Sequence, residues 1–214
     1  MPGCCPSAVC EEMFNPRFAR RSLRRYRKKG LDAIERGMVA SVSGELAGAR
    51  ILEIGGGIGT IQAELLAAGA DRGEIVELVA AYEPYARELA QEKGLEHRST
   101  FRVGNVLEQP GSVARADVVV LNRVVCCSPE GVRLAGVAAR LTERILLLSF
   151  PRDRFLVRAI LRLLNAVLSL MGRSFRAFVH PQAALYAAAQ GQGFEVAATG
   201  HGFVWEFASL RRTR

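Results

Sequence analysis

The segment "ILEIGGGIGT", from Ile51 to Thr60, decides the fold of this chain, because a short apolar run passes directly into four glycines within five positions. A strand that ends in glycines and turns into a helix brings bare backbone and helix N–H groups to one point. Glycine has no side chain, so a ligand can approach such a backbone closely. The segment therefore predicts a strand, a ligand-binding loop and a helix, in that order.

A carboxylate follows on the next apolar run. Glu77 ends "GEIVE", about 20 residues beyond the glycines, where nucleotide-binding folds place an acid that holds ribose hydroxyls. Thr60 stands where a dinucleotide fingerprint has glycine or alanine, which counts against NAD. A tight glycine turn without a ligand is the alternative. The two acids Glu53 and Glu77 around the loop favour a nucleoside-bearing cofactor.

Short apolar runs alternate with helical segments through most of the chain. Helices are predicted near 59–68, 81–93 and 129–140, between the first strands. This alternation predicts an α/β fold with a mostly parallel sheet and helices on both faces. Only "TGHG" separates the last two runs, which predicts a hairpin turn and an antiparallel final strand. The predicted strands are Ala49–Ile54, Glu74–Leu78, Thr100–Val103, Asp117–Leu121, Arg144–Ser149, Phe194–Ala198 and Phe203–Ala208.

Length and composition fit one globular domain. Half of the 214 residues are hydrophobic, which argues against disorder. No uncharged apolar stretch is long enough to predict a transmembrane span. The N-terminus "MPGCCPSAVCEE" lacks the pattern of a signal peptide, and five cysteines do not suggest a secreted disulfide framework. A cytoplasmic protein with reduced thiols is therefore expected.

The net charge of +8 has a local origin. Eight of the 29 basic residues lie between Arg17 and Lys29 with no acid among them, and the remaining 21 balance the 21 acidic residues. Aromatic residues at near-helical spacing predict a basic amphipathic helix over 11–29 that ends at Gly30. A second helix is predicted from Leu31 to Val42. We therefore expect a basic helical arm or cap over 1–48 and a catalytic domain over 49–214.

The segment 154–172 interrupts the regular alternation. Apart from a narrow polar stripe it is apolar, more so than an ordinary surface helix. It lies in a predicted helical insertion at about 152–180, where an α/β enzyme can carry a lid.

Five motifs carry a resemblance to a known family. The chain resembles the class I S-adenosylmethionine-dependent methyltransferases from about Ala49 to the C-terminus, a Rossmann-like fold. The resemblance implies the strand order 3-2-1-4-5-7-6 and S-adenosyl-L-methionine lying across the carboxyl ends of strands 1, 2 and 4. The motifs are "ILEIGGGIG", "GEIVEL", "RVGNV", "VVVLNRVVCC" and "ILLLSFPR".

The same resemblance assigns cofactor contacts. The glycines would line the methionine portion with Glu53 nearby, the second strand would hold the ribose, and the third the adenine. Asn105 and Asn122 depart from the family, where acids are frequent; the asparagine carbonyl oxygen can still accept a hydrogen bond from adenine. The implied cofactor residues are Glu53, Gly55, Gly57, Gly59, Glu77, Leu78, Asn105, Val106, Asn122 and Arg123.

The expected reaction is methylation of a small to medium acceptor, apolar or acidic, most simply on oxygen. The chain is similar to magnesium-protoporphyrin O-methyltransferases and their uncharacterised bacterial relatives in its aromatic–basic N-terminal helix, "LLSFP" and "FVHPQAALYAAAQGQGFEV". His180 would act as a base, or would cap or pack. Tyr26 would close the cofactor pocket, or pack. The catalytic candidates are Tyr26, Arg123, Cys126 and His180.

Three other hypotheses remain open, and a fourth is disfavoured. Cys126 and Cys127 lie near the expected methyl position, and Cys4, Cys5 and Cys10 lie on the arm, so thiols could support an arsenite-type methyltransferase. Their spacing matches no zinc pattern, so no metal site is predicted. The basic arm could contact an anionic membrane, whereas a nucleic-acid partner is disfavoured because no binding module is visible. The altered asparagines would also suit a cofactor-binding partner subunit without activity.

Overall fold

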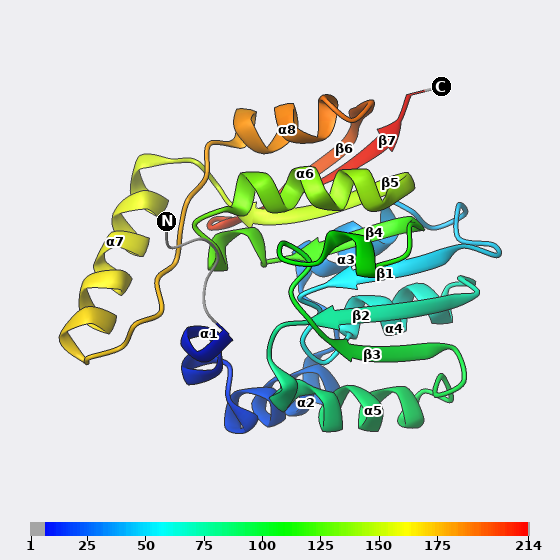
Figure 1. Cartoon of the computed structure of the whole chain (residues 1–214), viewed down its shortest axis with the longest axis horizontal. Helices are drawn as coiled ribbons and strands as arrows, with labels where there is room; N and C mark the ends of the chain where they lie inside the picture. The colour runs from blue at the N-terminus through cyan, green and yellow to red at the C-terminus, as the bar shows by residue number, and fades with distance from the viewer. Residues whose placement is uncertain (1–6, 214) are drawn as a thin grey trace.

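A seven-stranded sheet forms the centre of the protein, in a computed structural model that describes residues 7–213. The predicted strand order is confirmed as β3-β2-β1-β4-β5-β7-β6, and β7 runs in the opposite direction to the other strands (Figure 1). The strands are β1 (Arg50–Ile54), β2 (Arg72–Glu77), β3 (Ser99–Val103), β4 (Ala116–Asn122), β5 (Thr142–Pro151), β6 (Phe194–His201) and β7 (Trp205–Arg212).

Helices cover both faces of this sheet. On one face α3, α4 and α5 pack on the strands, and on the other face α6 and α8 do so (Figure 1). The α-helices are α1 (Ser7–Met13), α2 (Pro16–Lys29), α3 (Ala33–Ala40), α4 (Thr60–Ala67), α5 (Glu83–Glu92), α6 (Gly131–Leu141), α7 (Phe155–Leu170) and α8 (Gln182–Gln190).

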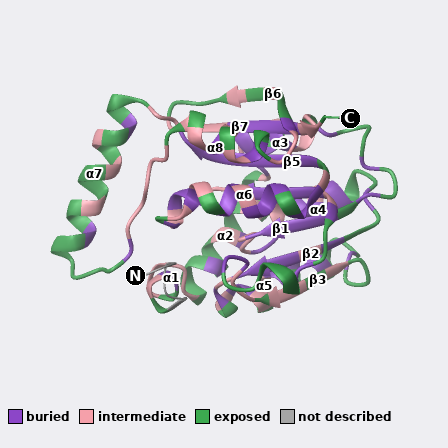
Figure 2. Ribbon diagram, turned by 45° about the horizontal axis from the view of Figure 1, so that its top comes forward, coloured by how far each residue is buried: buried purple, intermediate pink, exposed green. Residues whose placement is uncertain are grey.

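The central strands are buried on both sides, as Figure 2 shows. Successive residues of β4 alternate between two hydrophobic clusters: Val118 and Val120 join one, and Val119 and Leu121 join the other. Side chains of a strand point alternately to the two faces, so a strand between two helical layers must be apolar throughout. This explains the continuous run "VVVL" in the sequence.

The single helix predicted over 11–29 is wrong, because the chain forms two helices there. The Asn15 side chain accepts hydrogen bonds from the backbone N–H groups of Arg17 and Phe18, at 3.1 and 3.2 Å, and so begins a new helix. Pro16 occupies the first turn of that helix, where its missing N–H costs nothing. The predicted end at Gly30 is correct, with φ of 64°.

The N-terminal segment shares one hydrophobic core with the sheet. Asp32 begins α3 through a capping box with Glu35, and the buried side chain of Met38 on this helix packs in the same cluster as Val118 and Ile145. Leu23 of α2, only 1 % exposed, belongs to that cluster too. The segment 7–46 is therefore built into the body of the molecule.

The predicted hairpin turn "TGHG" is wrong, because β6 continues through His201 and the chain reverses between Gly202 and Trp205. Gly200 is a strand residue here. The ring of Phe207, its partner on β7, lies so close that a Cβ on Gly200 would collide with it. Gly200 is therefore needed for a close packing contact within the sheet and does not form a turn.

The apolar helix α7 stands at one end of the molecule, away from the sheet (Figures 1 and 2). Only Val157 and Leu168 on it are buried. Within residues 7–213, no helix combines the length and apolar character that a membrane crossing requires.

Replacing Leu23 by alanine should lower the free energy of unfolding by about 2–4 kcal/mol, because it leaves a cavity in the shared core. Urea unfolding should still show one transition, at a lower midpoint. Arg24→Ala, on the exposed side of the same helix, is the control and should shift the midpoint little. An unchanged midpoint for Leu23→Ala would mean that α2 does not contribute to the core.

Candidate functional site

The glycine loop connects β1 to α4 in a conformation that other residues rarely adopt. Gly55, Gly57 and Gly59 have φ angles of 65°, 57° and 74°. A Cβ on Gly59 would collide with the Ile75 side chain, and one on Gly57 would lie 3.2 Å from the Tyr82 ring. The alternate glycines therefore let the loop turn tightly against β2 and Tyr82.

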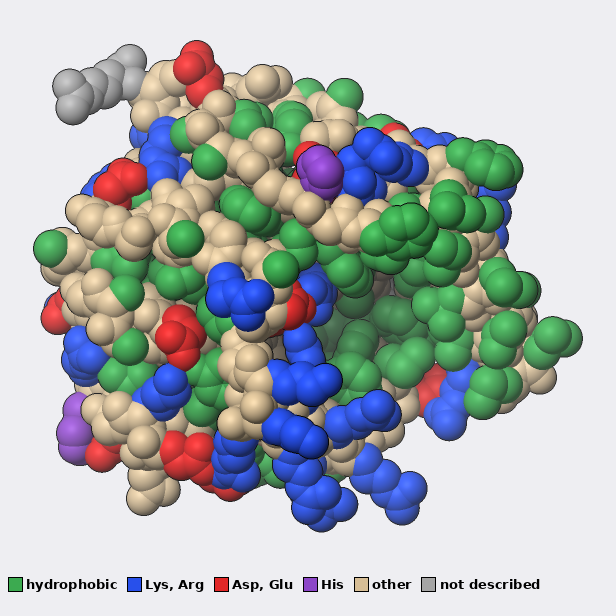
Figure 3. All heavy atoms as spheres, turned by 180° about the vertical axis from the view of Figure 1, so that it is seen from behind, with side chains coloured by type: hydrophobic (Ala, Val, Ile, Leu, Met, Phe, Trp, Pro, Cys, Tyr) green, Lys and Arg blue, Asp and Glu red, His purple; other side chains and the backbone are tan. Residues whose placement is uncertain are grey.

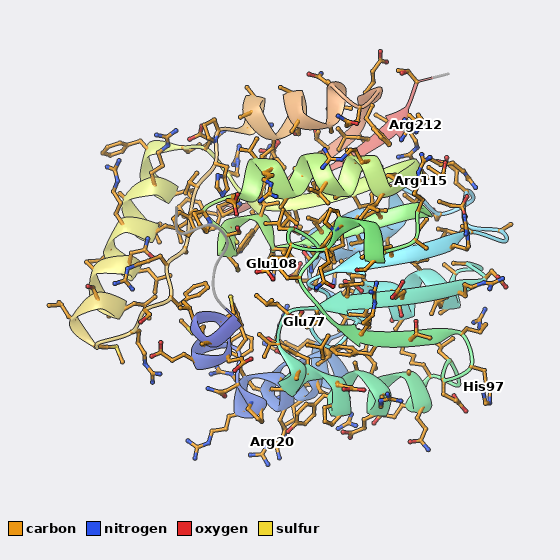
Figure 4. The ribbon with its side chains drawn as sticks, viewed as in Figure 1. Arg20, Glu77, His97, Glu108, Arg115 and Arg212 are labelled. Atoms are coloured by element: carbon orange, nitrogen blue, oxygen red, sulfur yellow. The ribbon has the colours of Figure 1, made fainter. Side chains whose placement is uncertain are left out.

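The Glu77 carboxylate binds this loop directly. Its Oε2 accepts a hydrogen bond from the Gly57 N–H at 2.9 Å, and its Oε1 accepts one from the Val79 N–H at 3.1 Å. Burial raises the pKa of Glu77, although backbone hydrogen bonds oppose the shift. In Figure 4, Glu77 and Glu108 lie at the edge where β1–β4 end, and Arg115 and His97 lie toward the opposite edge.

A cavity of about 500 Å³ opens at this edge of the sheet. It is bounded by the glycine loop, the ends of β2 and β4, and the N-terminal helices. Its lining includes most of the residues predicted for the site, namely Tyr26, Gly55, Gly57, Glu77, Leu78, Asn105, Val106, Asn122, Arg123 and Cys126. Residues from positions far apart in the chain therefore meet around one space.

Glu53 and Gly59 are absent from this lining. Glu53 is 1 % exposed, and its Oε2 accepts a hydrogen bond from the Gln62 N–H at 3.0 Å, which ties the end of β1 to α4. Burial first, and the nearby carboxylates of Glu35 and Glu77, raise the pKa of Glu53 to about 8. Glu53 is therefore protonated at neutral pH and supports the loop from behind.

Glu35 lies in the site although it is not among the residues predicted from the sequence. Its Oε2 accepts from the Asp32 N–H at 2.8 Å in the capping box, and its Oε1 accepts from Asn122 Nδ2 at 3.2 Å. Glu35 is 6 % exposed and lines the cavity. The D-x-x-E pattern predicts the start of a helix, but nothing in the sequence indicates that this acid meets the end of β4.

Arg123 follows β4 with a φ of 59°, the only positive value at a non-glycine residue in the described part of the chain. Its N–H donates to Ser149 Oγ at 2.9 Å, and Asn122 Oδ1 accepts from the same hydroxyl at 2.6 Å. The guanidinium pairs with Asp32 at 2.5 Å and lies 4.8 Å from the centre of the Trp205 ring. Strained backbone held by such contacts is common at functional sites.

Two catalytic candidates have their polar groups engaged elsewhere. The Tyr26 hydroxyl donates to the Glu64 carboxylate, and burial and Glu64 raise the pKa of Tyr26. His180 lies outside the cavity lining, and its Nε2 is 3.0 Å from both the Val125 and Ser128 carbonyl oxygens. Two carbonyl acceptors require a proton on Nε2, so His180 anchors the turn after β4. The geometry favours the packing alternatives for both residues.

Asn105 forms the turn after β3. Its Oδ1 accepts from the Leu107 N–H at 3.0 Å and its Nδ2 donates to Glu108 at 2.9 Å.

Three thiols line the same cavity, those of Cys10, Cys126 and Cys127. The Cys126 and Cys127 sulfurs are 3.9 Å apart. Hydrogen bonding to Cys126 and burial raise the pKa of Cys127, so this thiol stays protonated. Within residues 7–213, no group of three or more potential ligands is arranged to hold a metal ion; Cys4 and Cys5 lie outside the described residues.

The outer part of the cavity is apolar. The Phe14 ring packs edge-on against Phe18 and Phe175, with ring centres 5.5 and 5.3 Å away, and Leu161 and Leu164 of α7 complete this wall. The inner part carries polar and charged side chains and the outer part is aromatic and aliphatic, so the cavity suits a ligand with a polar end and an apolar body.

Comparison with known proteins gives a fold without a sequence family. No family model and no curated protein matches the sequence. Among solved structures, magnesium protoporphyrin IX methyltransferase from Synechocystis PCC 6803 with bound SAH is similar at a TM-score of 0.75, with 20% identity over 96% of this chain and 99% of that one.

Two larger proteins share the fold as well. An O-methyltransferase family protein from Burkholderia thailandensis has a TM-score of 0.71 and 22% identity over 95% of this chain and 62% of its own. An O-methyltransferase family 2 protein from Planctomyces limnophilus in complex with apigenin has a TM-score of 0.68 and 18% identity, over 96% of this chain and 65% of its own. This chain thus spans less than two thirds of either protein. At these identities the likeness confirms the predicted class I methyltransferase fold.

Glu53→Gln should flatten the dependence of stability on pH. Folding raises the pKa of this carboxyl group from 4.5 to about 8. Its contribution to the free energy of unfolding is therefore fully present below pH 4.5 and is lost as pH rises through 8. The free energy of unfolding of the native protein should therefore fall by roughly 2–3 kcal/mol between pH 6 and pH 9, and that of the variant by much less. Urea unfolding at both pH values measures the two changes.

Glu64→Gln is the matched control. The pKa of Glu64 is lowered, so this group is ionised throughout that pH range and its removal should leave the pH dependence unchanged. Equal slopes for the native protein and Glu53→Gln would contradict the assigned protonation of Glu53.

Proposed function

We propose that this protein is an S-adenosyl-L-methionine-dependent methyltransferase. The observation that carries the proposal is the meeting of Glu77 and the Gly57 N–H on the wall of one cavity. The similar fold of the Synechocystis enzyme with bound SAH supports it.

The residues of the cavity fit this cofactor. The Glu77 carboxylate accepts backbone hydrogen bonds from Gly57 and Val79, and its two oxygens together have about four lone-pair sites, so a site remains for a ribose hydroxyl. The glycine loop offers unobstructed backbone for the methionine portion, and Asn105 and Val106 border the space expected for adenine. When bound, S-adenosylmethionine supplies an activated methyl group on a sulfonium.

Glu35 extends this set. Asn122 stands where relatives frequently have an acid, and its amide holds the Glu35 carboxylate in the cavity wall. We infer that Glu35, carried by α3, restores the negative charge at that place and faces the positively charged donor. A cation in a partly buried site is stabilised by a nearby carboxylate.

The acceptor is proposed to be an apolar molecule methylated on a carboxylate oxygen. A hydroxyl must lose a proton, but the Tyr26 hydroxyl and His180 Nε2 are engaged away from the cavity. A carboxylate is already ionised at neutral pH and needs no base. Arg123 lines the cavity, and its guanidinium, fixed by Asp32, offers a positive charge for such an anion.

Glu77→Gln should weaken S-adenosylmethionine binding about ten-fold or more in calorimetry, because it removes a charged acceptor for the ribose hydroxyls. Glu35→Gln should weaken binding by a similar order, through loss of charge near the sulfonium. Glu74→Gln is the control on the same strand: its carboxylate pairs with Arg102 at 2.8 Å and does not line the cavity, so binding should be unchanged. Native protein that shows no binding would end the proposal.

His180→Gln should lower the rate of methyl transfer by less than ten-fold, because His180 only positions a turn; loss of a general base would cost roughly 10²–10⁴-fold. The measurement is methyl release from labelled donor across porphyrin carboxylates, small acids, phenols and arsenite. Activity on phenols that exceeds activity on every carboxylate would contradict the proposed acceptor.

An arsenite-type methyltransferase remains a second candidate, because three thiols line the cavity. This candidate function requires that the native protein methylates arsenite and that Cys126→Ser and Cys127→Ser abolish this activity. A protein that binds the donor but transfers no methyl group in any of these assays would instead fit a partner subunit without activity.

A further inference from the structure

The outer face of α7 is a large apolar surface without a covering element. Exposed apolar side chains on and just after this helix include Leu163, Leu170 and Met171, which are 67%, 89% and 64% exposed. At about 100° per residue, those from Leu156 to Met171 fall within about 120° of the helix circumference. The surface comprises Leu156, Ile160, Leu163, Leu164, Val167, Leu170 and Met171.

A basic surface lies across the cavity opening from this helix. Six exposed residues of α2 pair with no acidic side chain of residues 7–213, whereas Arg25 and Arg27 on the same helix are paired. In Figure 3 a hollow lined by hydrophobic atoms lies between a cluster of Lys and Arg and a rim of hydrophobic side chains. The six are Arg17, Arg20, Arg21, Arg24, Lys28 and Lys29.

Both helices contribute to the cavity wall. Phe18 and Ser22 of α2 line it on one side, and Leu161 and Leu164 of α7 on the other. The Arg173–Glu12 ion pair, at 3.0 Å, and the Phe14–Phe175 ring contact join the N-terminal helices to the segment after α7. The apolar surface, the basic surface and the opening therefore belong to one side of the molecule.

We propose that this side of the protein docks on the surface of an anionic lipid bilayer. The outer face of α7 enters the boundary between headgroups and acyl chains, and the basic residues of α2 contact the acidic headgroups. A helix of 16 residues is too short to span the bilayer, so α7 lies in its plane. A nucleic acid matches the charge of α2 but offers nothing to cover the apolar face of α7.

The orientation gives the cavity an entrance from the bilayer. With α2 and α7 both at the membrane, an apolar acceptor passes from the lipid into the outer cavity past Phe18 and Leu164 without crossing water. This consequence rests on the proposed function, whereas the docking itself does not.

Vesicle flotation tests the docking without any turnover. The full chain should float with vesicles of phosphatidylcholine and phosphatidylserine, should float poorly with phosphatidylcholine alone, and should detach as salt rises. Leu163→Gln with Leu170→Gln should lower partitioning roughly ten-fold or more. The control Val196→Gln, at an exposed apolar site on β6, should behave as the native protein.

Charge-reversal variants distinguish the effect of the basic surface of α2 from the effect of the net charge of the protein. Arg20→Glu with Arg24→Glu should also lower partitioning about ten-fold. Arg72→Glu with Arg87→Glu reduces the formal net charge equally, from +8 by four to +4, and should have little effect. Circular dichroism checks that each variant folds; all sites are on the surface.

Three results would overturn the proposal. The first is native protein that does not float with anionic vesicles. The second is equal loss in the Arg72/Arg87 control, which would reduce the effect to net charge. The third is undiminished flotation of the Leu163/Leu170 variant, accompanied by tight binding of single-stranded RNA; the basic residues would then serve a polyanion instead of a bilayer. None of these outcomes depends on S-adenosylmethionine binding.

Discussion

The hydrogen bond from the Gly57 N–H to the Glu77 carboxylate is the contact on which the site depends. It joins the loop after β1 to the end of β2, so backbone and carboxylate face one space. The loop can approach because Gly57 leaves room for the Tyr82 ring and Gly59 for Ile75. Behind the loop, Glu53 holds the first turn of α4. A side chain at either glycine would separate the two elements that form the wall of the cavity.

Two carboxylates, those of Glu35 and Glu77, belong to the inner wall of the cavity. Glu53 lies behind this wall, where burial first, and the nearby carboxylates of Glu35 and Glu77, raise its pKa to about 8. Neighbouring carboxylates repel each other when they are ionised, and a bound cation would relieve that repulsion. The proposed positively charged donor fits this arrangement, in which Asn122 binds the carboxylate of Glu35 from another part of the chain.

The N-terminal helices connect this inner wall to the surface. α3 supplies Glu35, and Asp32 at its start fixes the Arg123 guanidinium. α2 packs Leu23 into the core and turns its basic side outward. The segment described from the sequence as an arm therefore combines three roles, in the core, in the cavity wall and on the surface, and its position relative to α7 determines where the cavity opens.

The sequence by itself determined the alternating strands and helices and the position of the glycine loop and Glu77, because these follow from local patterns: apolar runs, glycines at fixed spacing and an acid at a strand end. The strand order was implied by the resemblance of five motifs to a known family. Two predictions were wrong for local reasons. Pro16 begins a new helix where one continuous helix was predicted, and Gly200 makes room for the Phe207 ring where a turn was predicted. Only the tertiary structure brings Glu35 into contact with Asn122 and places His180 Nε2 within hydrogen-bond distance of two carbonyl oxygens. It also leaves the outer face of α7 uncovered. Such contacts join residues far apart in the chain, and no periodicity or spacing along the sequence records which distant side chains meet.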